Sequence, residues 1–544
     1  MNSIKTPPTP LPQAEESSTP AARKPNIFET FPAGLAFTAL ALLIWLFVWD
    51  DYGISWDQSV DLRFGQAVLR YFTEGFNYQH IVEYPVSNLK FYSPLVALLS
   101  STGAQITGFD VFSCGAAVNG LFWVATFWPV CCIGQSMGGK AASWLAGIAL
   151  LAMPAYMGHG FINTKDLPFA CAVSWFLLAI LWATQRSRMG LFSATLVGLA
   201  FGLVLAVRPG GFFVGALLLF PLLQHGTGIM QGKLTMDWKN FLYSCLWLGV
   251  SGILAWIIMV APWPSAHRNP ILHPFESMVL ASKFHEAYPV LFQGEYHQSN
   301  KLPWHYFFVY FGVTIPPLIL IGAMIGQARQ VWMFFTGRDR SQMGSLLFLV
   351  WFPLLAFVVL RMNVYDGVRH FLFLLPLFAV SAALGGAWLA ECLPKSLGVW
   401  RAVLIAAVFC SSLPNLRSLH PYQYTYYNFM AGPRESLHQR FETDYWVTSY
   451  REAAEWINRI ARPNPRVILA ANAFSEPAFL HYVKPGSEHM SVLADYSSTP
   501  FPTEADFYVG TVRYGQDRNF SATPIRKVIE REGIRMAVIR SPHN

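Results

Sequence analysis

Apolar runs of membrane-spanning length recur along most of this chain, and they constrain its fold more than any other feature. The run from Pro32 to Trp49 has no charged residue and is long enough to cross a hydrocarbon core of roughly 30 Å at about 1.5 Å per residue. Comparable runs follow at 112–134, 142–157, 168–184, 191–207, 210–224, 241–262, 305–325, 345–360, 371–391 and 401–415. The sequence therefore predicts an all-α polytopic membrane protein with about eleven transmembrane helices.

The composition supports the same class of protein. Hydrophobic residues make up 53% of the chain and charged residues only 13%, which is too little charge for a surface that faces water throughout. The formal net charge of +7 is scattered over short connectors and forms no basic stripe. Nucleic acid is therefore not an expected partner, whereas membrane lipids are.

The connectors between the runs differ in charge according to the side on which they would lie. The short connectors on one side hold Lys140, Arg186, Arg188, Lys233, Lys239, Arg329, Arg338, Arg340, Lys395 and Arg401. The connectors on the other side, at 50–111 and 263–304, are longer and hold several acidic residues. Because short basic loops face the cytoplasm, we expect a multi-pass protein of the cell (inner) membrane with its N-terminus inside and its C-terminus outside.

The chain divides into three predicted regions. Residues 1–30 are rich in Pro, Ser and Thr and are expected to form a disordered cytoplasmic tail. Residues 31–415 form the membrane domain with its outer loops, and residues 416–544 form a small extracytoplasmic α/β domain. In that last domain RVILAANAF, ADFYVGTVRY and MAVIRS predict strands, and YREAAEWINRIA and PIRKVIEREG predict helices.

Charged residues at the ends of membrane spans are costly and are therefore functional candidates. Asp57 and Asp61 follow the first run and share one face if the segment is helical. A carboxylate there can deprotonate an acceptor or bind a cation that steadies a phosphate, and a solvated acidic loop is the alternative. The segment GHGFINTKDLPF holds His159, Lys165 and Asp166, where Lys165 suits a phosphate and Asp166 also suits a helix cap.

Two further clusters lie at the ends of later runs. Arg208 ends the fifth run, where a fixed cation either meets an anion or reaches toward the lipid headgroups. Asp366, Arg369 and His370 lie between the ninth and tenth runs, where Arg369 suits a phosphate and Asp366 could simply neutralise it. All four clusters fall on the predicted outer face. One acidic loop and several cations there fit an anionic lipid-linked substrate better than a water-filled pore.

Five stretches resemble a known family as a set. They are WDQSVDLRFGQAVLRYF, GHGFINTKDLPFA, VLFQGEYHQSNKLPWHYF, YDGVRHFLFLLP and HPYQYTYYNFMAGP. They are similar to membrane glycosyltransferases of the GT-C type, in the branch of the protein O-mannosyltransferases and the aminoarabinose transferase of lipid A. The resemblance implies transfer of a hexose or pentose, with inversion or retention, from a polyprenyl-phosphate carrier to a lipid, glycan or protein acceptor on the outer side.

The resemblance also implies roles for the charged residues. Asp57 would be the catalytic base, and Lys165, Arg208 and Arg369 would neutralise the carrier phosphate as it leaves. These family members commonly carry Glu after this Asp, but Gln58 follows it here and cannot take a proton. The substrate-binding set is predicted to be Asp61, His159, Lys165, Asp166, Arg208, Asp366, Arg369 and His370. No metal ligand is assigned, and a divalent cation stays open as a cofactor.

Two other classes of protein fit parts of the pattern. A transporter or lipid flippase would also need many spans, but it usually shows internal repeats and charge near the bilayer midplane, and neither is evident. A non-catalytic scaffold is the other alternative if Gln58 marks a lost activity. In that case substitution of Asp57 would leave the function unchanged.

Overall fold

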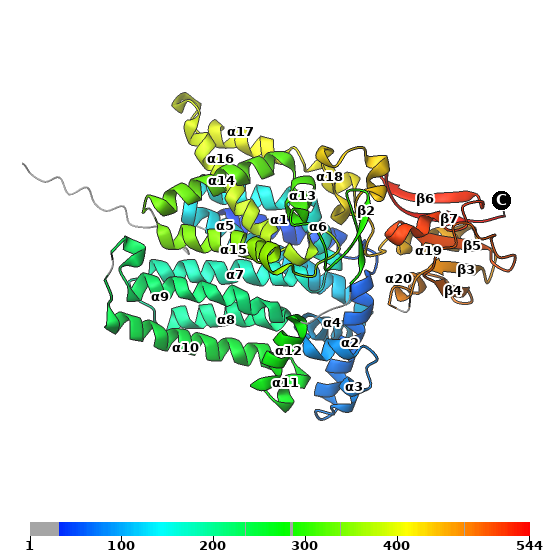
Figure 1. Cartoon of the computed structure of the whole chain (residues 1–544), viewed down its shortest axis with the longest axis horizontal. Helices are drawn as coiled ribbons and strands as arrows, with labels where there is room; N and C mark the ends of the chain where they lie inside the picture. Colours follow the sequence, from blue (N-terminus) through cyan, green and yellow to red (C-terminus); the bar gives the residue numbers. More distant parts are fainter. Residues whose placement is uncertain (1–31, 234, 283–286, 338, 473, 544) are drawn as a thin grey trace, which may run out of the picture.

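The computed structural model describes residues 32–543 apart from 234, 283–286, 338 and 473. The predicted tail at 1–30 lies outside the described residues. The helices lie roughly side by side in one bundle, and a sheet domain formed by the C-terminal residues lies beyond one end of it (Figure 1). The chain is thus a helical membrane domain with a small α/β domain attached at one end.

Each predicted apolar run is helical over most of its length. The helices are α1 (Pro32–Val48), α5 (Val111–Leu151), α7 (Asp166–Gln185), α8 (Leu191–Val207), η2 (Pro209–Leu218), α9 (Leu219–Gly226), α10 (Trp238–Val260), α13 (Tyr306–Thr314), α14 (Pro317–Phe335), α15 (Arg340–Leu360), α16 (Leu374–Cys392) and α17 (Trp400–Cys410). Within the described residues, six of them are long and apolar enough to cross a membrane by length and composition, namely α5, α7, α10, α14, α15 and α16.

Helix α5 is a hairpin that accounts for two predicted runs. The hydroxyl of Ser143 donates to the carbonyl oxygen of Cys131 at 2.9 Å, whereas twelve residues of one straight helix would separate them by about 18 Å. The chain reverses at Gly139, whose φ of 77° is in the left-handed region that favours glycine. Two antiparallel passes therefore lie where 112–134 and 142–157 were predicted.

The predicted run at 305–325 is divided into α13 and α14. Pro316 lacks an amide hydrogen, and Ile315 before it has extended backbone with φ −91° and ψ 137°. A residue before proline is driven out of the helical region in this way, so the helix stops and restarts. The last predicted run is also shorter than expected, because α17 ends at Cys410.

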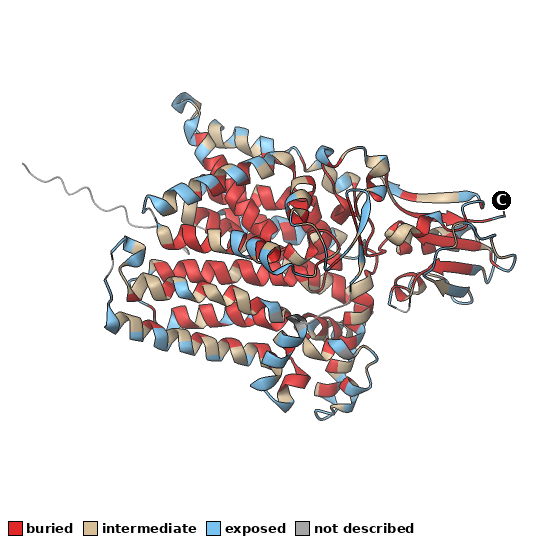
Figure 2. Ribbon diagram, in the orientation of Figure 1, coloured by how far each residue is buried: buried red, intermediate tan, exposed pale blue. Residues whose placement is uncertain are grey.

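The outer surface of the bundle is apolar. Leu242, Leu246, Ile253 and Ile257 of α10 each leave about three-fifths of their surface exposed, whereas α7 at the centre is buried nearly throughout (Figure 2). A row of exposed aliphatic side chains of this length is rare in water. It is the surface expected of a helix that faces lipid.

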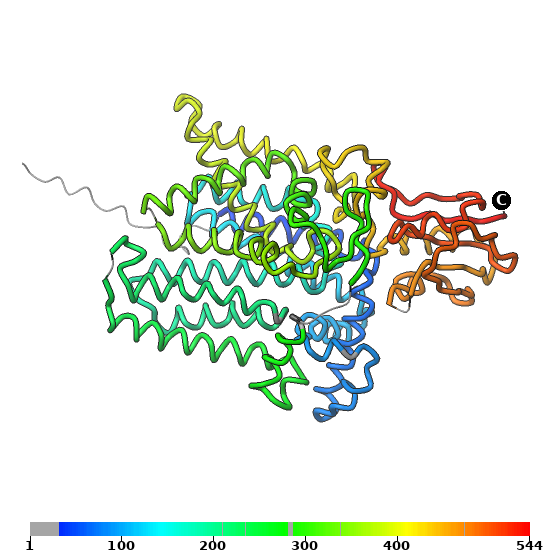
Figure 3. Tube along the Cα trace, viewed as in Figure 1, coloured from blue at the N-terminus to red at the C-terminus, as the bar shows by residue number. Residues whose placement is uncertain are grey.

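The elements outside the bundle gather at the end where the C-terminal domain lies. They are α2 (Trp56–Thr73), α3 (Gln79–Val82), η1 (Ser87–Phe91), α4 (Leu95–Thr107), α6 (Pro154–Ile162), α11 (Pro264–Arg268), α12 (Leu272–Ser282), β1 (Pro289–Phe292), β2 (Glu295–Gln298) and η4 (Arg369–Phe371). Residues 56–107 lie beside 264–282 (Figure 3), and the indole of Trp263 donates to the carbonyl oxygen of Lys90 at 2.9 Å. The two predicted outer loops are therefore in contact with each other.

Helices α7, α14 and α16 all end at the opposite end of the bundle (Figure 1). Their connectors to α8, α15 and α17 are the basic ones, and η3 (Ile229–Gln231) and η5 (Lys395–Leu397) belong to this end as well. The bundle therefore has one basic end and one end that carries the long mixed loops. The side of the membrane that each end faces stays a prediction.

The C-terminal domain contains a five-stranded sheet in the order β4-β3-β5-β7-β6. β3 is parallel to both β4 and β5, and β7 is antiparallel to both β5 and β6. The remaining elements are α18 (Pro414–Ser418), η6 (Gln423–Thr425), η7 (Phe429–Ala431), η8 (Arg434–Gln439), α19 (Tyr450–Ile460), β3 (Arg466–Ala470), α20 (Pro477–Leu480), β4 (Glu488–Val492), β5 (Phe507–Thr511), η9 (Arg513–Arg518), β6 (Ile525–Arg531) and β7 (Ile534–Arg540). The three predicted strands and the helix at 450–460 are confirmed.

The predicted helix PIRKVIEREG is wrong, because these residues form strand β6. Ile525, Val528 and Ile529 have a spacing that also suits a helix face, but Val528 and Ile529 pair with consecutive residues of β7, so their side chains point to opposite faces of the sheet, and of the three only Ile529 is buried. Glu532 and Gly533 have φ of 50° and 81°, which are the two left-handed residues of a tight hairpin turn. The Glu-Gly pair was therefore the better guide to the local structure.

Candidate active site

Ser55 and Gln58 fix the start of α2 and thereby the position of Asp57. The Ser55 hydroxyl accepts from the backbone of Gln58, and the Gln58 side-chain oxygen accepts from the backbone of Ser55 at 2.9 Å. The Gln58 amide nitrogen also donates to the carbonyl oxygen of Phe161 at 3.0 Å. The glutamine is buried and joins α2 to α6, so Asp57 in the first helical turn has a fixed place.

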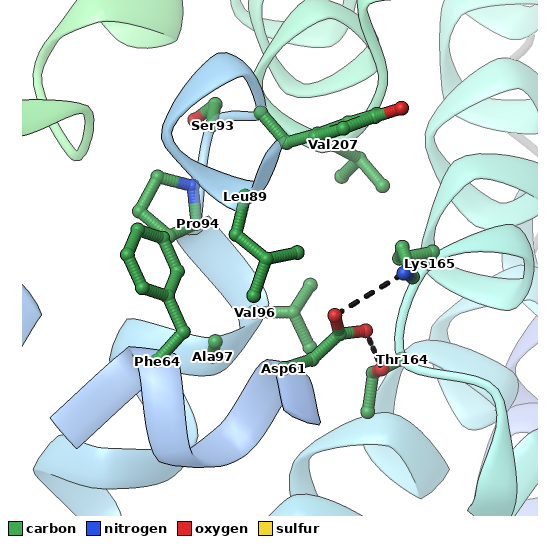
Figure 4. Close-up of a pocket in the computed structure, with 11 residues that line it drawn as sticks. Asp61, Phe64, Leu89, Ser93, Pro94, Val96, Ala97, Thr164, Lys165 and Val207 are labelled. Atoms are coloured by element: carbon green, nitrogen blue, oxygen red, sulfur yellow. Dashed lines mark hydrogen bonds and ion pairs between the residues drawn. The ribbon is translucent and has the colours of Figure 1, made fainter. Parts of the chain in front are cut away.

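Asp57 and Asp61 lie on one face of α2, as predicted, and both contact Lys165. The Lys165 ammonium lies 3.1 Å from Asp61 Oδ1 and 3.7 Å from Asp57 Oδ2. The hydroxyl of Thr164 donates to the other oxygen of Asp61 at 3.0 Å (Figure 4). The residues before α7 therefore hold the two carboxylates of α2 with one ammonium and one hydroxyl.

Arg369 joins Asp57 to Asp366. One nitrogen of its guanidinium lies 3.1 Å from Asp57 Oδ2 and 3.1 Å from Asp366 Oδ2. The loop before η4 aims these groups inward, since Asp366 and Gly367 have φ of 59° and 64° and the Gly367 amide donates to the hydroxyl of Tyr306 at 3.1 Å. A non-glycine residue held in this region is a strained position of the kind found at functional sites.

Asp166 and Arg208 form the next pair, at 2.7 Å. Asn163 orients Asp166, because its side-chain oxygen accepts from the Asp166 amide at 2.8 Å and its side-chain nitrogen donates to Asp166 Oδ2 at 3.1 Å. The first residue of α7 and the residue that follows α8 are thus tied together. The alternative in which Arg208 reaches only toward lipid headgroups does not describe its contacts.

The C-terminal domain adds a cation that the sequence did not indicate. Arg513, at the start of η9, places one guanidinium nitrogen 3.2 Å from Asp366 Oδ1. The same nitrogen donates to the carbonyl oxygen of Tyr445, and the guanidinium lies 5.0 Å from the ring centre of Trp56. Asp61, Lys165, Asp57, Arg369, Asp366 and Arg513 consequently form one continuous chain of ion pairs.

The two predicted histidines lie behind this chain. His159 is fully buried, its Nδ1 accepts from the Asn163 amide at 3.1 Å, and its Nε2 lies 3.1 Å from the hydroxyl of Tyr445. His370 stacks edge-on with Tyr365, and its Nε2 is buried without a hydrogen-bond partner among the described residues. Burial and nearby cations hold the pKa of His370 well below its usual range, so its ring is neutral.

The surroundings of α2 shift the pKa values of its two carboxyl groups in opposite directions. Burial alone would raise the pKa of Asp57, but Lys165, Arg369 and two further arginines lower it to about 2. Burial raises the pKa of Asp61, and Lys165 opposes this effect only in part. Asp57 is therefore the more acidic of the two carboxyl groups.

Glu442 is a second group that the sequence did not indicate. It lies in the segment before α19, and burial together with the neighbouring Asp366 raises its pKa to about 8. One of its oxygens is buried without a hydrogen-bond partner among the described residues. A carboxyl that is largely protonated at neutral pH therefore lies beside the chain of ion pairs.

Among the hollows at this end of the bundle, two differ sharply in size and lining. One of about 40 Å³ lies against Asp61 and Lys165 among apolar side chains (Figure 4), which is far below the roughly 300–1,000 Å³ of a ligand pocket. The other has about 700 Å³ and lies between residues 300–304 and the end of α15. Its lining includes Lys301, Trp304, Phe357 and Arg361, and the described lining residues include no acid.

No metal ligand can be assigned among the described residues. They contain no group of three or more His, Cys, Asp or Glu side chains that could hold an ion. The ammonium of Lys165 lies between Asp57 and Asp61, at 3.7 Å and 3.1 Å.

Seven of the predicted residues are therefore brought together, and two positions were missed. The only sequence signal for Arg513 is that it follows directly after the apolar strand FYVGT and precedes a Tyr-Gly turn, which does not specify a role. Glu442 carries no signal at all, because one acid in an aqueous segment is ordinary. Both are identified by their contacts alone.

The bundle and its charge cluster define a class of protein: a polytopic membrane protein with a buried set of ion pairs under a soluble cap domain. No protein-family model matches the chain, and no curated protein matches it in sequence. Solved structures do match. The crystal structure of ArnT from Cupriavidus metallidurans bound to undecaprenyl phosphate has a TM-score of 0.51 and 15% identity, and the match covers 93% of this chain and 97% of ArnT.

The apo oligosaccharyltransferase of Archaeoglobus fulgidus also has a TM-score of 0.51, at 11% identity, and the match covers 89% of this chain and 70% of that protein. Both are GT-C glycosyltransferases. The chain therefore has the GT-C fold with a C-terminal sheet domain, as the five sequence stretches predict. At these identities the likeness establishes the fold, and the reaction has to be argued from the site.

Proposed function

We propose that this protein transfers a sugar from a polyprenyl-phosphate carrier to an acceptor at the end of the bundle that bears the ion-pair chain, with Asp57 as the base. The observation that carries the proposal is the partly exposed Asp57 carboxylate held between Lys165 and Arg369. These groups come from three separate segments of the membrane domain. Such convergence of one carboxylate and several cations suits an anionic leaving group and a proton acceptor in one site.

Lys165 and Arg208 are the cations best placed to meet the carrier phosphate. Their side chains are 29% and 24% exposed, whereas the side chain of Arg369 is 6% exposed and is paired with two carboxylates. A phosphate can therefore reach the first two without opening the buried part of the chain. Arg369 acts behind them by holding Asp57 in position.

Binding of the phosphate would also prepare the base. In the resting protein the pKa of Asp57 is about 2 because cations surround it, and a carboxylate of that kind is a weak proton acceptor. A phosphate that takes over part of the charge of Lys165 weakens this hold. The pKa of Asp57 then rises toward the range in which a base is useful.

The reaction can be written with its atoms balanced. An acceptor hydroxyl or amine attacks the anomeric carbon of the sugar, and the bond from that carbon to the carrier phosphate oxygen breaks. The carrier phosphate leaves as an anion neutralised by Lys165 and Arg208, and the acceptor proton passes to the Asp57 carboxylate. The sugar, the acceptor and the stereochemistry stay open in this scheme.

The hollow of about 700 Å³ supports a lipid-linked donor. Lys301 and Arg361 line it, and neither has an ion pair among the described residues. Phe357 and Val358 from the last turn of α15 supply apolar surface, and Trp304 is of the type that favours the headgroup layer. This hollow would receive the carrier close to its phosphate, since residues 361–366 lead from it to Asp366.

The test is transfer of label from a panel of radiolabelled polyprenyl-phosphate sugars to membrane acceptors, with purified wild type and Asp57→Asn in lipid nanodiscs. We expect transfer from at least one donor, reduced by about 100-fold or more in the variant, as is typical when a general base is lost. The matched control is Asp495→Asn, which makes the same change at an exposed position of the C-terminal domain.

Two outcomes would contradict the proposal. Transfer that survives in Asp57→Asn at the wild-type rate would remove Asp57 as base. No transfer from any donor by folded wild type would turn the argument to the transporter or scaffold alternatives. Melting curves of both variants show that a loss of transfer is not a loss of fold.

A further inference from the structure

The side chain of Arg513 reaches from the C-terminal domain to the ion pairs of the membrane site. Arg513 is 10% exposed, and its guanidinium reaches Asp366 Oδ1 at 3.2 Å across the boundary between the two parts of the chain. It also donates to Tyr445 O, and one of its nitrogens donates to the hydroxyl of Tyr514 at 3.1 Å. A guanidinium buried to this degree is costly unless its partners are fixed.

The backbone around Arg513 turns in a way that lets the side chain extend to Asp366. The next two residues, Tyr514 and Gly515, have φ of 54° and 68°, so the chain turns sharply where strand β5 ends and projects the side chain away from the sheet. The guanidinium lies between two rings, 5.0 Å from the centre of Trp56 and 4.9 Å from that of Tyr514. Trp56 is the residue directly before Asp57, so this contact also touches the start of α2.

Asp366 divides its two oxygens between two arginines from different parts of the chain. Oδ1 contacts Arg513, and Oδ2 contacts Arg369. Arg369 in turn uses a single nitrogen for both Asp366 and Asp57. Without Arg513, Asp366 would keep only Arg369 as its ion-pair partner, and it would draw that guanidinium away from Asp57.

We infer that Arg513 is a positioning residue of the transfer site: its guanidinium forms an ion pair with Asp366 from the C-terminal domain so that Arg369 stays on Asp57. This inference rests on the function proposed above for Asp57. It gives the C-terminal domain a part in the reaction beyond covering the site. The domain would act through Asp366 and Arg369 and would not touch the substrate.

The charged groups that face Asp57 predict in which direction its pKa changes when Arg513 is lost. They are Lys165, Arg208, Arg369, Arg513 and Asp61, with the Tyr365 hydroxyl close by. Loss of Arg513 removes one cation directly and loosens a second. The carboxylate should then hold its proton at higher pH than in the wild type.

The experiment compares Arg513→Met with Arg513→Lys and with Arg466→Met, a matched control on the exposed surface of β3. For Arg513→Met we expect kcat to fall about tenfold or more, the donor KM to stay within about threefold, and the acid limb of kcat to move up by about one pH unit. Arg513→Lys should recover much of kcat, because it keeps the charge. Arg466→Met should match the wild type in all three quantities.

Hydrogen–deuterium exchange separates this inference from the proposed function. In Arg513→Met, amides at 365–371 and 55–59 should exchange faster while the strands of the sheet keep their protection. Unchanged exchange at both segments would overturn the inference, whether or not the wild type transfers sugar. Equal loss of kcat in the Lys and Met variants with no shift of the acid limb would also overturn it, because that pattern indicates a general loss of structure.

Discussion

Gln58→Glu is the most informative single change, because it introduces the acid that the family resembled by this sequence commonly carries after the Asp that is Asp57 here. If Gln58 marked a lost catalytic group, this change would raise activity. The contacts predict the opposite result. The amide nitrogen of Gln58 donates to the carbonyl oxygen of Phe161 at 3.0 Å in a buried position, and an ionised carboxylate cannot make that bond.

Two effects of this change oppose each other. A glutamate suits the third position of a helix that begins with a serine cap, and its charge near the helix N-terminus stabilises by about 0.3–1 kcal/mol. Against this, the Phe161 carbonyl loses its donor and faces a buried negative charge, which costs about 1–3 kcal/mol or more. The loss is the larger effect, so the variant should be destabilised by about 1–2 kcal/mol.

The dependence on pH makes this prediction specific. Burial should raise the pKa of the introduced carboxyl above its unfolded value of about 4.3. The penalty is therefore absent below that value, where the protonated carboxyl can donate to Phe161, and it grows as the pH rises from there to the folded pKa, above which it is constant. Chemical denaturation of both proteins between pH 4 and 8 measures it, and Gln105→Glu at an exposed position of α4 is the matched control.

The result that would refute this reasoning is a variant as stable as the wild type at pH 8. A rise in sugar transfer would refute it as well, because the carboxylate would then face the substrate. Lower stability together with unchanged or lower transfer would support the assignment of Gln58 to structure. It would also remove the main argument for a non-catalytic scaffold.

Three further predictions follow from the ion pairs. Asp57 has a pKa of about 2 in the folded protein, below its unfolded value. Its ionised form therefore stabilises the fold above about pH 4, and this stabilisation is lost as the pH falls toward 2. In thermal denaturation, the stability difference between wild type and Asp57→Asn should narrow over that range. Arg208→Gln should lower kcat/KM for the donor about tenfold or more, because the residue neutralises the phosphate when the donor binds and again when the carrier leaves; an unchanged kcat/KM would refute this role. Lys301→Gln combined with Arg361→Gln should weaken binding of polyprenyl phosphate about tenfold and leave binding of uncharged polyprenol unchanged. Equal weakening of both ligands in a fluorescence titration would show that this hollow does not recognise the phosphate charge.

The membrane part of the fold and most of the site could be predicted because membrane sequences leave little room for ordinary charge. An ionised group near a membrane span is costly unless it is paired or functional, so Asp57, Lys165, Arg208 and Arg369 stand out against apolar surroundings. Arg513 lies in a soluble domain, where surface arginines are common, and its role depends on a contact across the two parts of the chain. The sequence around Arg513 does not predict such a contact.

Local structure was harder to predict where two periodicities overlap. Ile525, Val528 and Ile529 of β6 have the sequence spacing of a helix face, and the positive φ angles of Glu532 and Gly533 mark a hairpin turn instead. The hairpin in α5, by contrast, could be predicted from the sequence. There the apolar run is divided by Lys140 and two glycines, so the break between the two passes was visible in the sequence.

The balance of charge in the cluster bears on the order of events in the proposed reaction. Each of Asp57, Asp61, Asp166 and Asp366 lies within ion-pair distance of at least one of Lys165, Arg208, Arg369 and Arg513. A donor phosphate adds negative charge and must take a cation away from a carboxylate. Asp57 is the most exposed of the four and is the one it would release. An acceptor that arrives first would meet a carboxylate too weakly basic to take its proton, so the donor has to bind before the acceptor can be activated.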